Sequence, residues 1–346
     1  MNVKALLFGL LFLLPAPMWA QGYAGLGGSV DGFDIPKQGY QFQFPRDHGP
    51  HPSFRIEWWY LTANLTGEDG RDYGVQWTLF RSALKPTQTD GWQSPQLWMG
   101  HAAVTTPDAH YLAERLSRGG IGQAGVTAAP YEAWIDEWHM RGPDPDTLTL
   151  TASGEEFHYD LSLTAQGPLV FHGDAGYSVK SADGQASHYY SQPFYDVEGV
   201  LHLPDGDVAV TGQGWLDREW SSQPLAEDQS GWDWFSLSFD DGDKLMAFRL
   251  RGGRGDFTAA TWISADGTAT PLPDGSASFI PLETARVEDR EVPVTWQVTL
   301  PDYDLDVEVT ALTPKAWMAT QFEYWEGPVK VSGNRSGRGY LEMTGY

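Results

Sequence analysis

The sequence predicts an all-β protein built as two tandem antiparallel β-barrels, and three observations support this class. Aromatic residues make up 14% of the chain, and 39 glycines and 23 prolines accompany them, a composition typical of strands joined by tight turns. Short strand-like runs recur along the chain, whereas the period of an amphipathic helix is almost absent. Two halves of the chain also carry similar motifs in the same order, which indicates repeated structural units.

The N-terminus has the pattern of a secretory signal peptide. Lys4 precedes the apolar run Ala5–Leu14, and the small residues Ala16 and Ala20 follow it. A charge, an apolar core and a small-residue region in this order are typical of a cleaved leader. The run is shorter than the roughly 20 apolar residues of a spanning helix. We therefore expect a signal peptide over residues 1–20, a protein that does not span the membrane, and export to the periplasm or beyond the cell.

Composition excludes several classes of function. The chain has no cysteine, so disulfides, thiolate metal sites and the acylated cysteine of a lipoprotein are excluded. With 46 acidic and 22 basic residues, the formal net charge is −24, which repels nucleic acid and anionic membranes. The chain also exceeds the roughly 250–300 residues at which a single hydrophobic core stops growing. We therefore expect two domains after an irregular segment over residues 21–50.

Turn residues divide the chain into candidate strands. Residues 58–65 and 73–80 flank a Gly- and Asp-containing turn at residues 67–70, which is typical of a β-hairpin. The best candidate for a short helix is Glu132–Met140. Further strands are expected at residues 98–105, 145–151, 156–164, 196–203, 207–217, 231–239, 244–251, 256–263, 293–300, 304–312 and 328–333.

The internal repeat is marked by an opening and a closing motif in each half. The first half opens with an aromatic run at residues 58–60, and the second opens with a similar run at residues 232–235. The closing motif reads Gly-x-Gly-aromatic-Leu-acid at residues 212–217 and again at residues 337–342. Glycines two apart share one face of a strand, where they allow a bend or a close backbone approach. We predict two barrels, over residues 51–222 and 223–346.

Long tryptophan-rich motifs recur over residues 40–346. They are Glu57-Trp58-Trp59-Tyr60, Gly100-His101-Ala102-Ala103-Val104-Thr105, Tyr189-Tyr190-Ser191, Asp217-Arg218-Glu219-Trp220-Ser221 and the terminus Gly339–Tyr346. In these motifs the chain resembles the AttH / carotenoid 1,2-hydratase family, whose members are also described as predicted secreted hydrolases. The resemblance implies two lipocalin-like β-barrels in tandem. It also implies an apolar, isoprenoid- or lipid-like ligand and, for the hydratase members, addition of water to a double bond.

Asp217 and Glu219 are the first candidates for acid–base chemistry. They are two residues apart on a predicted strand, so their carboxyl groups share one face, and mutual repulsion favours a proton on one of them. A neutral carboxylic acid can protonate an alkene, and a carboxylate can then activate water. The alternative is a structural ion-pair arrangement in which Arg218 bridges the two acids at a domain junction.

Two further residues are candidates for catalysis, each with a structural alternative. Glu57 precedes three aromatic residues, where burial at a barrel mouth would raise its pKa; alternatively it pairs with Arg55 or Arg81. His101 opens a predicted strand, where it is either an acid–base group or a hydrogen-bonded structural histidine. The expected ligand contacts are Trp58, Trp59, Tyr60, Tyr189, Tyr190, Trp220, Trp232 and Asp233, although core packing is the alternative for the tyrosines.

Other chemistries lack their signatures in this sequence. There is no Gly-x-Ser-x-Gly elbow, no His-Glu-x-x-His motif and no Gly-x-x-x-x-Gly-Lys phosphate-binding loop. His48 and His51 are the only closely spaced pair of histidines. We do not predict a metal site from this pair alone, and we expect no cofactor. The expected function is therefore hydratase-like or hydrolase-like action on an apolar small molecule. The alternative is a non-catalytic periplasmic carrier of such a ligand, associated with an ABC-type export system.

Overall fold

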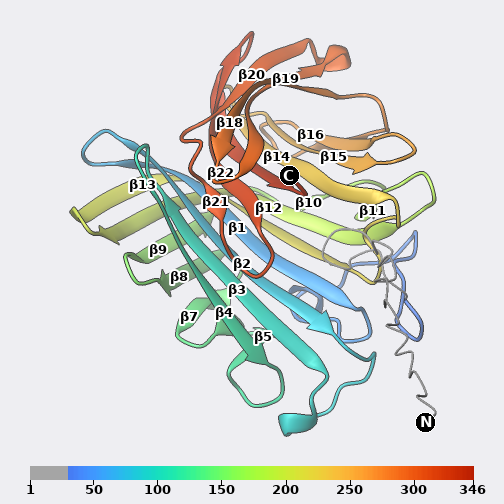
Figure 1. The fold of residues 1–346 in the computed structure, drawn as a ribbon. Coiled ribbons are helices and arrows are strands. Elements are labelled where there is room, and N and C mark those ends of the chain that lie inside the picture. Colours follow the sequence, from blue (N-terminus) through green and yellow to red (C-terminus); the bar gives the residue numbers. More distant parts are fainter. Residues whose placement is uncertain (1–29) are drawn as a thin grey trace, which may run out of the picture.

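The computed structural model describes residues 30–346, and in this range the chain is all-β apart from short 3-10 turns. Strands form two antiparallel sheets, one between residues 56 and 221 and one between residues 229 and 344. Figure 1 shows the first sheet in blue to yellow and the second, in orange and red, packed beside it. The predicted signal peptide lies outside the described residues. Within them, no helix has the length and apolarity needed to cross a membrane.

The first sheet curls into a nearly closed barrel of eleven strands. Their order is β4, β3, β2, β1, β13, β12, β9, β8, β7, β6 and β5, and the short strands β10 and β11 pair with β12 outside this path. The strands are β1 (Ile56–Gly67), β2 (Asp72–Ala83), β3 (Gln96–Thr105), β4 (His110–Arg118), β5 (Ala124–Ala128), β6 (Tyr131–Ile135), β7 (Trp138–Asp144), β8 (Thr147–Ser153), β9 (His158–Ala165), β10 (Val170–Phe171), β11 (Tyr177–Val179), β12 (Ala186–Leu203) and β13 (Gly206–Ser221).

The second sheet is a curled half-barrel with a related strand order. The order is β17, β16, β15, β14, β23, β22, β20, β19 and β18, with β21 paired to β22. The strands are β14 (Gln229–Phe239), β15 (Lys244–Gly252), β16 (Phe257–Ile263), β17 (Ala269–Leu272), β18 (Ser278–Val287), β19 (Arg290–Leu300), β20 (Leu305–Ala311), β21 (Trp317–Met318), β22 (Tyr324–Gly333) and β23 (Gly337–Thr344). The prediction of two tandem lipocalin-like β-barrels is confirmed, with the second more open than the first.

The two halves of the repeat have the same sheet register. In each half the opening and closing strands are hydrogen-bonded neighbours: β1 pairs with β13, and β14 pairs with β23. Tyr60 lies opposite Asp217 in the first sheet, and Trp234 lies opposite Glu342 in the second. Tyr60 is therefore equivalent to Trp234, and Asp217 to Glu342. The hairpin of β5 and β6 has no counterpart in the second sheet's path, and it extends the first sheet toward closure.

Each barrel has its own apolar interior, and a third apolar layer lies between the sheets. Trp59 and Trp77 belong to the first interior, and Phe235 and Trp296 belong to the second. The layer between the sheets contains buried residues from both: Ile56, Tyr60, Val170, Tyr189, Trp215, Leu225, Trp234, Met246, Phe248, Leu250, Ile263 and Tyr340. Because burial of apolar surface is the dominant favourable term in folding and association, this layer holds the two sheets together.

The segment before β1 covers one end of the first barrel. Residues 30–55 contain no strand and only the 3-10 turn η2 (Arg46–His48). Tyr40 and Phe42 pack beside Trp220, which is fully buried. The ring of His51 stacks on the Trp220 indole, with 3.9 Å between the ring centroids. Trp220 therefore closes this end of the barrel together with the N-terminal segment.

The predicted helix over Glu132–Met140 is wrong. The segment contains parts of β6 and β7, which form a tight hairpin with Asp136 at φ 52° in the turn. Tyr131, Ala133 and Ile135 are buried, and the residues between them are half-buried. Burial of every second residue is typical of a strand that packs one face against a core.

The Gly-x-Gly motifs mark places where two backbones approach each other. A Cβ atom on Gly212 would lie 2.0 Å from the carbonyl oxygen of Asn64, and one on Gly337 would lie 2.2 Å from that of Ser238. In each case the obstacle is the backbone of the neighbouring strand. The close approach predicted from the motif is confirmed, and its cause is the tight pairing of the opening and closing strands.

We predict that Gly212→Ala destabilises the protein by about 1–3 kcal/mol, because the backbone must shift to admit the methyl group. Gly253→Ala is the matched control. A Cβ atom at Gly253 meets nothing closer than 3.9 Å in the hairpin after β15, so its effect should stay within about 0.5 kcal/mol. Urea denaturation of both variants measures the difference, and equal stabilities would contradict the close-approach explanation.

Candidate functional site

A cavity of about 180 Å³ lies between the outer faces of the two sheets. Its walls are mainly aromatic and aliphatic, with a small set of acidic and other polar groups among them. The lining residues are Trp58, Tyr60, Thr78, Phe80, Met99, His101, Lys180, Asp217, Glu219, Pro224, Leu225, Trp232, Trp234, Phe248, Leu250, Phe322, Tyr324, Glu342 and Thr344. Apolar concavities with a few convergent polar groups are typical of small-molecule sites.

Strand alternation decides which residues reach this cavity. On β1, Trp58 and Tyr60 point outward to the cavity, whereas Trp59 between them points into the first barrel. On β14, Trp232 and Trp234 line the cavity in the same way. Both sheets therefore contribute an aromatic pair from the opening of their repeat. The site belongs to both halves of the chain, although the four catalytic candidates from the sequence all lie in the first half.

Asp217 is a buried carboxyl group at the centre of a hydrogen-bond network. The Tyr189 hydroxyl donates to its Oδ2 at 2.7 Å, and the Trp215 indole N–H donates to its Oδ1 at 2.7 Å. The Ser191 hydroxyl also donates to Oδ1. Burial raises the pKa of Asp217 to about 7, although these donors oppose the rise; the nearby charge of Glu219 adds to it. Asp217 can therefore gain or lose a proton near neutral pH.

His172 extends this network to the second sheet. Its Nε2 lies 2.7 Å from the Ser191 hydroxyl, and its Nδ1 lies 3.0 Å from the Thr261 hydroxyl on β16. Burial holds the pKa of His172 well below its usual range, and the charge of Lys180 adds to this effect. A neutral imidazole thus fixes Ser191, which in turn orients the carboxyl group of Asp217.

Glu342 is the counterpart of Asp217 in the second repeat, and it faces the same cavity. The indole N–H of Trp232 donates to its Oε1 at 2.6 Å. Burial raises the pKa of Glu342 to about 7, and the charges of Asp217 and Glu219 contribute. Glu342 is not among the site residues predicted from the sequence. The signal that could have selected it was its position in the closing motif, at the same place as Asp217.

A second buried acid lies next to Glu342. Glu326 lies directly opposite it on β22, and burial, with the charge of Glu342, raises the pKa of Glu326 well above its usual range. The pKa of Tyr60 is also raised well above its usual range, by burial and by the charges of Glu326 and Glu342. Burial therefore favours the protonated forms of Glu326 and Tyr60 beside Glu342, and Tyr60 and Glu342 line the cavity.

Glu219 lines the cavity beside Asp217, as the predicted alternation requires. The environment of Glu219 differs from that of Asp217. Lys180 Nζ forms an ion pair with Glu219 Oε1 at 2.8 Å, and the Ser187 hydroxyl donates to the same oxygen. The Lys180 ammonium also lies 4.2 Å from the centre of the Phe248 ring. Lys180 and Glu219 thus form a charged wall of the cavity, and Lys180, not Arg218, is the partner of Glu219.

His101 joins the two sheets at another wall of the cavity. Its Nδ1 lies 2.8 Å from the hydroxyl of Tyr324 on β22, and its Nε2 lies 3.2 Å from Glu114 Oε1 on β4. Both ring nitrogens therefore have partners within the protein. His101 is therefore the hydrogen-bonded structural histidine of the two alternatives, and its side chain also lines the cavity.

Five of the predicted site residues point away from the cavity. They are absent from its walls and lie in or at the ends of the barrel interiors: Glu57, Trp59, Tyr190, Trp220 and Asp233. Asp233 forms ion pairs with Arg249 at 2.7 Å and Arg251 at 2.5 Å. The remaining predicted residues, His101, Asp217, Glu219, Trp58, Tyr60, Tyr189 and Trp232, line the cavity or hydrogen-bond to a residue that does.

Glu57 is held in its charged form inside the first barrel. Arg81 Nη2 lies 3.4 Å from its Oε1, His51 Nδ1 lies 3.1 Å from the same oxygen, and Arg218 Nη2 lies 3.9 Å from its Oε2. Burial by itself would raise the pKa of Glu57, but the charges of Arg81, His51 and Arg218 lower it. The pKa of Glu57 is therefore shifted in the opposite direction to the one expected from the sequence. A carboxyl group that stays charged is a poor proton donor.

The fold and the cavity define a class of protein: two tandem β-barrels that enclose an acid-containing apolar pocket between them. The particular family follows from comparison with known proteins. The chain belongs to the AttH-like family, whose model matches residues 35–346. The family resemblance seen in the sequence motifs is thereby confirmed.

The solved structures that are similar to this chain include two that cover most of it. The crystal structure of an AttH candidate from Nitrosomonas europaea matches with a TM-score of 0.82 and 32% identity, over 91% of this chain and 99% of that chain. The crystal structure of kievitone hydratase from Nectria haematococca matches with a TM-score of 0.66 and 15% identity, over 90% and 98% of the two chains. At this identity the second likeness shows the fold alone. No curated protein sequence matches the chain.

We predict that Glu57→Gln destabilises the protein by about 3–5 kcal/mol, because it leaves Arg81 and Arg218 buried without their carboxylate. Glu156→Gln, in the exposed turn before β9, is the control and should change stability by less than about 0.5 kcal/mol. Chemical denaturation measures both. A fully stable Glu57→Gln variant would contradict the structural role assigned to this residue.

We predict that Glu342 makes the stability of the folded protein depend on pH. Its folded-state pKa of about 7 exceeds its usual value of 4.5, so between these values the folded state binds more protons than the unfolded state. Its contribution to stability is therefore lost as pH rises through this window. Glu342→Gln should remove that loss and raise stability at pH 8 by up to about 3 kcal/mol relative to the wild type.

Denaturation curves from pH 4 to pH 8 measure this effect, with Glu132→Gln, a partly exposed acid on β6, as the control. The control should keep the wild-type pH dependence. Parallel curves for the wild type and Glu342→Gln would show that Glu342 has an ordinary pKa.

Proposed function

We propose that this AttH-like protein is a hydratase-like enzyme that adds water to a carbon–carbon double bond of an apolar molecule in the inter-barrel cavity. The observation that carries this proposal is a pair of carboxyl groups, the buried Asp217 and the half-buried Glu342, on one apolar cavity. Both have a pKa of about 7. Two such groups provide an acid and a base at neutral pH, which is what addition of water to an alkene requires.

The hydrogen bonds of the two carboxyl groups suggest their roles. Asp217 accepts bonds from three donors, Tyr189, Ser191 and Trp215, and such donors favour the charged form of a carboxyl group. For Glu342 the Trp232 indole N–H is the donor at 2.6 Å, and the Tyr60 hydroxyl acts in the same direction, so Glu342 has fewer such donors than Asp217. We assign Glu342 as the general acid and Asp217 as the general base.

In the proposed reaction, the Glu342 proton moves to one carbon of the double bond, and the other carbon becomes a carbocation. A water oxygen bonds to this carbon while Asp217 takes a proton from the water. The product carries one added water, and exchange with solvent returns the proton from Asp217 to Glu342. Aromatic faces attract cations, so the Trp58, Trp232 and Trp234 rings of the cavity wall would stabilise the cation.

The cavity limits the substrate class. Its volume of about 180 Å³ accommodates a short branched apolar group, not an entire polyene. A branched, isoprenoid-type chain end also gives a tertiary cation on protonation. The substrate we propose is therefore an isoprenoid- or lipid-like molecule whose terminal unit enters the cavity. The leader-like pattern of the N-terminal residues supports action outside the cytoplasm.

We predict that Glu342→Gln and Asp217→Asn each reduce turnover at least about 100-fold while the ligand still binds. The assay incubates the purified protein with a panel of isoprenoid compounds, including acyclic carotenoids, and detects the water adduct by mass spectrometry. Quenching of tryptophan fluorescence measures binding. The wild-type rate should be highest near pH 7 and should fall on both sides, because one carboxyl group must be protonated and the other charged.

The Glu132→Gln variant is the matched control and should keep full activity. A wild-type protein that binds the panel compounds but returns them unchanged would overturn the hydratase proposal. That result would support a carrier of the same ligands, such as one that serves an ABC-type exporter. Unchanged turnover in both Glu342→Gln and Asp217→Asn would overturn the assignment of the two acids.

A further inference from the structure

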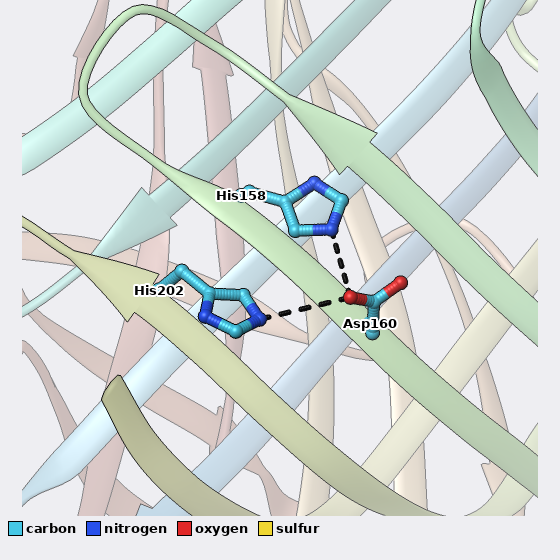
Figure 2. Close-up of side chains that lie close together, drawn as sticks. All are labelled: His158, Asp160 and His202. Carbon is cyan, nitrogen blue, oxygen red and sulfur yellow. Dashed lines mark hydrogen bonds and ion pairs between the residues drawn. The ribbon is translucent and has the colours of Figure 1, made fainter. Parts of the chain in front are cut away.

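Three side chains with metal-ligating atoms meet on the outer face of the first barrel. His158 and Asp160 lie on β9, and His202 lies on β12 (Figure 2). Their ligand atoms all lie within 4.8 Å of one another. Figure 2 shows both imidazole rings directed toward the Asp160 carboxylate. The cluster is partly open to solvent, with side-chain exposures of 42%, 54% and 38% for His158, Asp160 and His202.

The pairing of β9 and β12 places these residues together. His202 lies directly opposite His158 in the antiparallel register. Asp160, two residues beyond His158, shares its face of the sheet because side chains alternate along a strand. The backbones are also close here, since a Cβ atom on Gly199 of β12 would lie 2.1 Å from the Asp160 carbonyl oxygen. The three groups therefore stand on two tightly paired strands.

A fourth residue orients the ring of His202. Its Nδ1 lies 2.7 Å from Asp207 Oδ1 at the start of β13. A carboxylate only accepts hydrogen bonds, so Nδ1 carries the proton, and the Nε2 of the neutral ring has a free lone pair. This Nε2 faces Asp160 Oδ2 at 3.7 Å, which is too long for a hydrogen bond. In the neutral form of His202, two electron-pair donors therefore face each other across a gap.

A carboxylate that holds the second nitrogen of a histidine is the usual support of a metal-bound imidazole. It fixes the tautomer and the orientation of the ring and raises its basicity. Asp207 holds the Nδ1 of His202 in this way. His158 Nε2 lies 2.8 Å from Asp160 Oδ2 and donates to it. This third ligand atom therefore reaches the same gap, and a bound metal ion would take the place of its proton. The cluster therefore has more order than a chance group of surface residues.

We propose that His158, Asp160 and His202 form a binding site for a divalent transition-metal ion, with Zn²⁺ as the best match. Two imidazole nitrogens and one carboxylate oxygen are a common ligand set for this ion, with water in the fourth position. In a tetrahedral site with bonds of about 2.0–2.1 Å, ligand atoms lie about 3.3 Å apart. The contacts of 2.8 and 3.7 Å from Asp160 Oδ2 bracket this separation, so small side-chain rotations complete the site.

The site is remote from the inter-barrel cavity. Asp217 lies opposite Ser191, and His202 lies about 35 Å farther along β12 at the strand rise of roughly 3.3 Å per residue. A metal ion here cannot take part in chemistry in the cavity. It cross-links β9 to β12 in the folded state and stabilises that state by preferential binding. The proposal is independent of the proposed hydratase function.

The test is zinc binding to tag-free protein that has been treated with a chelator and then freed of it. We expect one equivalent of Zn²⁺ to bind by isothermal titration calorimetry, and thermal unfolding to shift to higher temperature with zinc and back with chelator. His202→Ala should abolish both effects. Asp207→Asn should keep the site and weaken binding by roughly 10–100-fold, as expected when the support of a metal-bound histidine is lost.

The matched control is His139→Ala, which removes another surface histidine paired with an acid. His139 Nδ1 lies 3.0 Å from Glu132 Oε1 on β6, and neither residue belongs to the cluster. This variant should bind zinc as the wild type does. A His158→Ala/His202→Ala double variant that binds zinc as tightly as the wild type would overturn the site, and so would a wild-type protein with no stoichiometric binding.

Discussion

The burial of both faces of the central strands is the constraint on which the rest of the structure depends. β1 and β13 in the first sheet, and β14 and β23 in the second, direct one set of side chains into a barrel and the alternate set toward the other sheet. Trp59 stabilises the interior of the first barrel, whereas Trp58, its neighbour in sequence, lines the cavity. The aromatic richness of the chain follows from this arrangement, because three apolar layers must be filled.

The same alternation separates the buried acids into two kinds. Glu57 and Asp233 point into barrel interiors, where arginines neutralise their charge. Asp217 and Glu342 point into the layer between the sheets, where no arginine or lysine forms an ion pair with them among the described residues. An unpaired carboxyl group in an apolar environment binds a proton more tightly, so their pKa values rise toward neutrality. Whether one of these acids can exchange a proton near neutral pH therefore depends on which face of its strand it lies on.

Duplication explains why two such acids face one cavity. The two sheets have related strand orders, and each presents the outer face of its opening and closing strands to the other. Equivalent positions in the two repeats therefore converge, as Asp217 and Glu342 do. The differences between the repeats make the cavity asymmetric: Lys180 and Glu219 form a charged wall, and His101 hydrogen-bonds across to Tyr324.

The sequence by itself determined the all-β class, the duplication, the family resemblance and the common face of Asp217 and Glu219. These are local properties, set by composition, turn residues and the period of a strand. Only the tertiary structure decided which face of each strand meets the other barrel. It therefore decided that Glu57 is an ion-paired structural acid, and that Glu342 is a partner of Asp217. It also brought His158 to His202, because sheet pairing joins residues that lie far apart in the sequence.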